Sequence, residues 1–150
     1  MEDTRRLLPL VLLRASDNEA VEGITRMQKL VFLAQEELSE LDVGEYRFEP
    51  DSYGPFSRDL YDDIDSLVAG GYVEEDEETT PSGNTKQVYE LTDKGEMYLN
   101  TIEELNDEEL PEEELKELKE EYNSMALLKL LKRVYDGHPD MTVNSELNLA

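Results

Sequence analysis

The sequence contains no cysteine and only one histidine, His138. Without cysteine the chain can form no disulfide, no thiol nucleophile and no cysteine-ligated metal site. A lone histidine has no second histidine with which to hold a metal or share a catalytic proton. The chain also lacks a glycine-rich phosphate loop and a Gly-X-Ser-X-Gly nucleophile motif. We therefore expect a protein that is not an enzyme and that needs no metal or cofactor.

Long hydrophobic runs are absent as well. The longest apolar stretch, residues 7–13, contains Pro9 and is too short to cross a membrane. Arg5 and Arg6 precede it as in a signal peptide, but the nearby acidic residues and the missing small-residue cleavage site argue against one. We expect this stretch to be a buried first helix in a cytoplasmic protein without a membrane partner.

Basic residues are scarce, with 14 lysines and arginines against 38 aspartates and glutamates, for a net charge of −24. Such a charge ordinarily repels nucleic acid. The acids are spread over most of the chain, which is typical of proteins adapted to high salt. In roughly molar salt the Debye length is about 3 Å, so repulsion from phosphates is largely screened. We favour this halophilic interpretation, under which net charge does not exclude DNA binding.

Hydrophobic residues make up 38% of the chain, so a globular fold is expected. Residues 4–14 are predicted to be helical. Residues 25–38 form a second predicted helix, with apolar residues at helical spacing and Thr25 as its N-cap. Residues 46–49 alternate like a short strand.

The stretch 48–78 predicts a third helix followed by a strand. Pro55 fixes the chain before the helix, Ser57 suits the N-cap, and Phe56 and Tyr61 stand at the positions of a hydrophobic staple. A glycine pair, 70–71, supplies the left-handed C-cap. The inward stripe comprises Leu60, Ile64, Leu67 and Val68.

Residues 71–75 and 86–92 then predict a β-hairpin with a long tip. Thr92 caps a helix over 93–105 whose apolar stripe ends at Leu105. Pro111 starts another helix, and Ser124 caps a last one over 125–137. The predicted fold is mainly α with a small β wing (α+β): a winged helix-turn-helix domain, residues 1–105, with additional C-terminal helices, residues 106–150. This extension is expected to pack on the domain or to dimerise.

Four segments carry a family resemblance. They are EGITRMQKLVFLAQEEL, YRFEPDSYGPFSRDLYDDIDSLVAGGYV, YELTDKGEMYL and the tail EYNSMALLKLLKRVYDGHPDMTVNSEL. They resemble the YwgA-like winged-helix proteins of archaea and bacteria, which are distantly related to the SocA-like antitoxins with a Panacea domain. The resemblance covers residues 7–147, and its most specific piece is the turn Tyr53, Gly54, Pro55, Phe56 and Ser57. It implies a winged-helix fold, and with the acidity it implies a haloarchaeal source.

In helix-turn-helix proteins the helix before the wing normally enters the major groove. Base reading uses polar and basic side chains, and residues 1–30 are neutral overall, so phosphate contacts are expected there too. The candidate DNA contacts are Arg26, Gln28, Lys29, Arg58, Ser66, Lys86 and Gln87.

Two functions remain open at this point. The first is a DNA-binding transcriptional regulator adapted to high salt. The second is a protein-interaction module of antitoxin or adaptor type that does not read DNA, because aspartates dominate the third helix. The expected partner is thus duplex DNA or a protein. A homodimer through residues 125–135 is a further expectation, because this segment is too apolar to bury through a single stripe.

Overall fold

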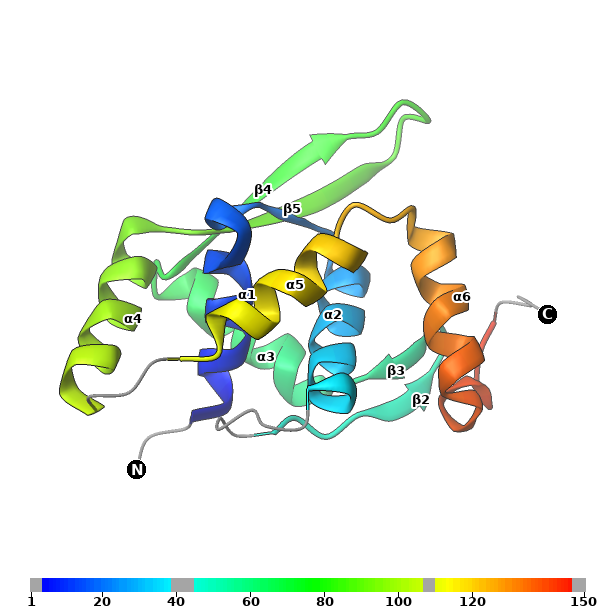
Figure 1. Cartoon of the computed structure of the whole chain (residues 1–150). Coiled ribbons are helices and arrows are strands. Elements are labelled where there is room, and N and C mark those ends of the chain that lie inside the picture. The colour runs from blue at the N-terminus through cyan, green and yellow to red at the C-terminus, as the bar shows by residue number, and fades with distance from the viewer. Residues whose placement is uncertain (1–3, 39–44, 107–109, 147–150) are drawn as a thin grey trace.

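The computed structural model describes residues 4–38, 45–106 and 110–146 (Figure 1). The predicted end of the unit that contains the second helix, residues 42–44, lies outside the described residues. Two short 3-10 helices span Thr4–Arg6 and Pro139–Thr142. The helices are α1 (Leu7–Asn18), α2 (Ile24–Glu37), α3 (Arg58–Ala69), α4 (Asp93–Asn106), α5 (Glu112–Tyr122) and α6 (Leu127–Gly137). The strands are β1 (Val21–Glu22), β2 (Glu49–Asp51), β3 (Gly54–Phe56), β4 (Val73–Thr79) and β5 (Thr85–Leu91).

The mainly helical fold with a small β wing is confirmed. The larger antiparallel sheet has the strand order β1-β5-β4, and β4 and β5 form the wing (Figure 1). The β4–β5 pairing runs from Val73 opposite Leu91 to Thr79 opposite Thr85, so the wing is longer and its tip shorter than predicted. The two-residue strand β1 pairs with β5 and was not predicted. The order α1-β1-α2-α3-β4-β5 is that of a winged helix.

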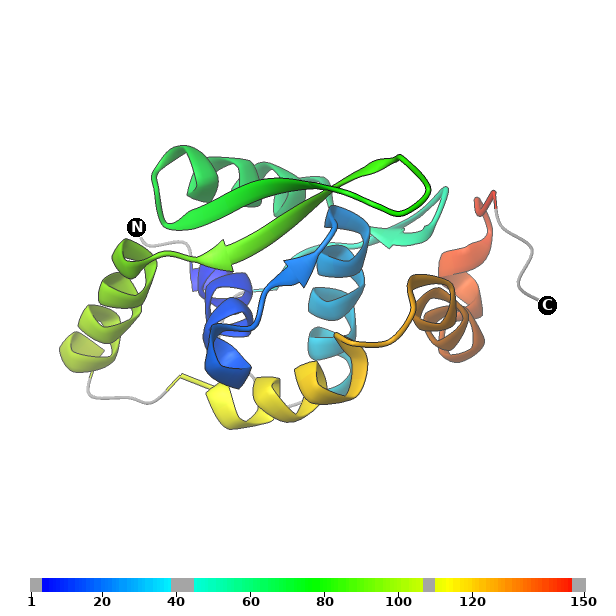
Figure 2. The same ribbon diagram turned by 90° about the horizontal axis from the view of Figure 1, so that it is seen from above.

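Helix α1 lies at the centre of the core, with α3 on one side and α5 on the other (Figure 2). Leu8, Leu10, Val11, Leu12 and Leu13 are all fully buried. Apolar residues lie on every face of α1, as expected for a helix that other elements cover on all faces. Pro9 is tolerated because it lies in the first turn, where no intrahelical hydrogen bond is lost.

The local signals around α3 are confirmed. The hydroxyl of Ser57 accepts a hydrogen bond from Leu60 N at 3.2 Å. The rings of Phe56 and Tyr61 lie 6.2 Å apart, as a staple requires. Gly71 takes a φ of +82°, the left-handed value expected at the end of the helix.

Four other local predictions are wrong. Gly23, not Thr25, is the N-cap of α2, and Ala126, not Ser124, precedes α6. Residues 46–48 form no strand, because the side chain of Gln35 bonds both Tyr46 N (2.8 Å) and Tyr46 O (2.9 Å). Leu105 is 77% exposed instead of completing the inward stripe of α4.

The hairpin β2–β3 between α2 and α3 was not predicted. Its strands are joined by a two-residue turn, with Asp51 opposite Gly54. Gly54 has a φ of +92°, and a Cβ there would meet the Tyr135 ring of α6 at 2.8 Å. Glycine is therefore needed both for the turn and for the close approach of α6.

The C-terminal helices pack on the rest of the chain. Helix α5 contacts α1 and α2, and α6 contacts α2 and β3. Arg26 donates to three carbonyl oxygens at the end of α5, those of Tyr122, Asn123 and Met125, at 3.4, 3.1 and 2.7 Å. No helix among the described residues is both long enough and apolar enough to cross a membrane.

Candidate nucleic-acid interface

The start of α3 is held by side chains of α2. The Gln28 amide accepts from Ser57 N at 2.8 Å and donates to Ser57 O at 3.0 Å. The ammonium of Lys29 donates to Pro55 O at 2.8 Å. The turn Tyr53 to Ser57 thus forms the end of the hairpin and the cap of α3, and two α2 residues fix its backbone.

The α2 residues predicted as DNA contacts are buried. Arg26 is 9% exposed, Gln28 1% and Lys29 2%. Burial lowers the pKa of Arg26 against the opposing effect of Glu22, and it lowers the pKa of Lys29 to about 8 against that of Asp51. Side chains buried to this extent cannot reach a DNA molecule at the protein surface, so their prediction as DNA contacts is not supported. The C-terminal extension and the β2–β3 hairpin, which helical spacing does not reveal, cover this face of α2.

The buried face of α3 holds one carboxylate. Asp63 is 3% exposed. It accepts a hydrogen bond from Tyr46 Oη at 2.8 Å and is paired with Arg5 Nε at 3.0 Å and Arg6 Nε at 3.3 Å. This network ties Arg5 and Arg6, which precede α1, to α3. The Arg5–Arg6 pair is visible in the sequence, but its spacing does not identify Asp63 as its partner.

The exposed face of α3 carries Arg58 and Ser66 alongside acidic side chains. Arg58 is paired with Asp62 at 3.3 Å, and both side chains are more than half exposed. The Arg58 guanidinium also lies 5.8 Å from the centre of the Tyr61 ring. Asp59 and Asp65 are exposed on the same helix. This face therefore offers one basic side chain among three carboxylates.

The wing contributes the other predicted contacts. Lys86 on β5 is paired with Glu22 at 2.6 Å and Glu78 at 4.0 Å. Gln87 is partly exposed, and its carbonyl accepts from Gly23 N at 2.7 Å. Strand β4, which packs against α3, is acidic throughout residues 74–78. Arg58, Ser66, Lys86 and Gln87 are thus the predicted contacts that keep access to solvent.

Comparison with known proteins finds a family model that matches part of the chain. Residues 36–101 match the model of the Transcriptional regulator PadR-like family. The matched segment runs from the end of α2 through the hairpin, α3 and the wing into α4, which is less than half of the chain. No curated protein and no solved structure matches. The YwgA-like and Panacea resemblance finds no counterpart in these comparisons.

Proposed function

We propose that this chain is a winged-helix transcriptional regulator that binds duplex DNA. The observation that carries the proposal is the match to a family of transcriptional regulators over the segment that contains α3 and the wing. Regulators of this architecture place the helix before the wing in the major groove. Because the matched family consists of transcriptional regulators, the match also argues against an enzymatic function.

Four exposed or partly exposed residues are the proposed contacts: Arg58, Ser66, Lys86 and Gln87. The Arg58–Asp62 pair is exposed, so breaking it to reach a base or phosphate costs little. With few cations on this face, counterion release contributes little to affinity. Binding is proposed to occur at high salt, where repulsion by the other carboxylates is screened.

The test is selection of fragments from sheared genomic DNA by the purified protein in about 2 M KCl, where screening is nearly complete. We expect one recurring sequence to be enriched. Arg58→Glu should weaken binding to it by about tenfold or more, because a groove contact is reversed in charge. Lys116→Glu is the matched control, since Lys116 is exposed on α5, on the opposite side of α1 from α3 (Figure 2).

A second function is favoured by the acidity of the same face. The carboxylates of α3 and the run at 74–78 suit a basic protein partner, as expected of an antitoxin-like or adaptor module. If the protein is folded at about 2 M KCl and enriches no DNA, the regulator proposal fails and this alternative stands. Loss of a co-purifying partner in Asp62→Asn/Asp65→Asn, but not in Lys116→Glu, would then support it.

A further inference from the structure

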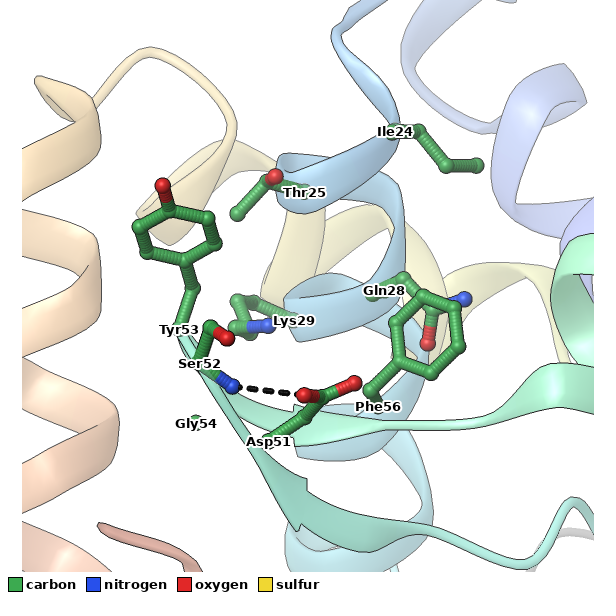
Figure 3. A pocket seen from close by; sticks show the side chains of 9 residues that line it. All are labelled: Ile24, Thr25, Gln28, Lys29, Asp51, Ser52, Tyr53, Gly54 and Phe56. Carbon is green, nitrogen blue, oxygen red and sulfur yellow. Dashed lines mark hydrogen bonds between the residues drawn. The ribbon is translucent and has the colours of Figure 1, made fainter. Parts of the chain in front are cut away.

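A pocket of about 230 Å³ lies between the first two turns of α2 and the β2–β3 hairpin (Figure 3). Its position is set by the turn of the hairpin, which α6 and the C-terminal segment hold from the other side. Ser52 O accepts from Glu146 N at 2.8 Å, and Ser52 Oγ donates to Glu146 at 2.8 Å. The turn that forms this wall of the pocket is therefore anchored to the C-terminal segment through Ser52.

Two opposite charges line this pocket. The Lys29 ammonium has three N–H donors, and among the described residues only Pro55 O accepts from it. The exposed Asp51 carboxylate faces the same space, with one of its oxygens accepting from Ser52 N at 2.8 Å (Figure 3). Burial lowers the pKa of Lys29 to about 8, so the ammonium is still mostly protonated at neutral pH. The pocket thus presents a donor cation and an acceptor anion together.

Apolar groups complete the walls. Ile24 lines the pocket from α2, and the rings of Tyr53 and Phe56 flank the two charged groups (Figure 3). The Tyr53 side chain is 48% exposed, although it sits on a hairpin held in place by α6. A tyrosine ring beside a pocket offers a large apolar contact area, and ordering its two χ angles costs little entropy.

We propose that this pocket binds a free α-amino acid. Lys29 donates to its carboxylate, Asp51 accepts from its ammonium, and its side chain packs against Tyr53 and Phe56. A simple anion would be repelled by the Asp51 carboxylate, and a simple cation would be repelled by the Lys29 ammonium. A zwitterion can pair with both groups and therefore suits the pocket better than either. The volume is below the range of about 300–1,000 Å³ typical for drug-sized ligands, which also favours a small molecule. The proposal concerns binding alone and does not depend on DNA being bound.

The test is isothermal titration of the full chain with the proteinogenic L-amino acids. We expect at least one with an apolar side chain to bind with a Kd below about 5 mM. Its N-acetyl derivative, which lacks the ammonium, and its amide, which lacks the carboxylate, should each bind about tenfold more weakly or worse. That loss corresponds to one charge-assisted hydrogen bond.

Asp51→Asn keeps the shape of the side chain and should reduce affinity for the amino acid by about tenfold. Its effect on the N-acetyl derivative should be small, because no ammonium remains to be bound. Glu49→Gln is the control, because Glu49 is exposed on the same strand and does not line the pocket. Lys29→Met should abolish binding, and its melting curve shows whether it is folded. The proposal is overturned if no amino acid binds, if the N-acetyl derivative binds as tightly as its parent, or if Asp51→Asn binds normally.

Discussion

Three buried cations, Arg26, Lys29 and Lys119, donate to main-chain carbonyl oxygens. Arg26 and Lys119 each reach a place where a helix ends: the C-terminus of α5 for Arg26, and the end of α1 for Lys119. The last carbonyls of a helix lack intrahelical donors and carry the negative end of its dipole. In a chain of 38 acids, these cations therefore stabilise backbone rather than neutralise carboxylates.

Lys119 should make the stability of the folded chain depend on pH. It is fully buried and donates to Ala15 O at 2.7 Å and Leu13 O at 3.2 Å. Burial lowers its pKa from 10.5 to about 8, despite Glu19 and Glu112. Between these two values the unfolded chain holds the proton that the folded chain has lost, so the stability of the folded state rises with pH there. Below about pH 8 Lys119 is protonated in both the folded and the unfolded chain. There the cost of burying the charged ammonium destabilises the folded state in full.

We therefore compare the free energy of unfolding of the wild type with that of Lys119→Met. The difference between the two should shift by about 2 kcal/mol in favour of the wild type when the pH rises from about 7 to about 9.5. Urea denaturation of both proteins at each pH measures this difference. Lys116→Met, an exposed change on the same helix, should follow the wild type at both pH values. Parallel pH profiles for the wild type and Lys119→Met would contradict the assignment.

Among the elements, α3 and the wing could be predicted from short-range sequence signals. The contacts that bury the side chains around them could not. The cap Ser57 and the staple Phe56–Tyr61 lie within a few residues of each other, so the pattern alone predicts them. The burial of Asp63 depends on Arg5, 58 residues away. The burial of Arg26 depends on carbonyls almost a hundred residues away. Side-chain spacing within one helix carries no information about such partners.

Helix α6 leaves part of its apolar surface uncovered. Leu130, Leu131 and Val134 are buried, whereas Leu127 is 40% and Leu128 62% exposed. Lys129 is exposed beside them. An apolar patch at the start of an otherwise packed helix favours a contact between two copies of the chain, which would place two α3 helices for paired half-sites. We propose a homodimer through residues 125–135 on this basis.

Light scattering tests the homodimer. The wild type should give twice the chain mass of 17.3 kDa, and Leu127→Ser/Leu128→Ser should give the mass of one chain. Leu105→Ser is the matched control, because Leu105 is a leucine 77% exposed on α4. A wild type with the mass of one chain at every concentration, or a double variant that stays dimeric, would remove α6 from consideration as the interface.

At the scale of the whole molecule, the dominant quantity is the net charge of −24. Repulsion among carboxylates destabilises the compact state at low ionic strength. One close group of carboxylates lies on the wing, where carboxylate oxygens of Glu74, Asp76 and Glu90 lie within 4.8 Å of one another. Like charges directly opposite on paired strands, as in Glu74 and Glu90, oppose the pairing itself. The stability of the wing should therefore depend on salt.

The halophilic proposal predicts that the free energy of unfolding rises steadily from about 0.1 to about 2 M KCl, as the Debye length falls toward the distance between neighbouring carboxylates. Urea denaturation at each salt concentration measures the slope. Glu74→Gln/Glu90→Gln should be more stable than the wild type at low salt and should gain less from KCl. Glu104→Gln/Glu120→Gln removes the same charge from exposed sites on α4 and α5 and should reduce the slope less. A stability independent of KCl would show that the acidity serves some purpose other than folding at high salt, because screening would then have no repulsion to relieve.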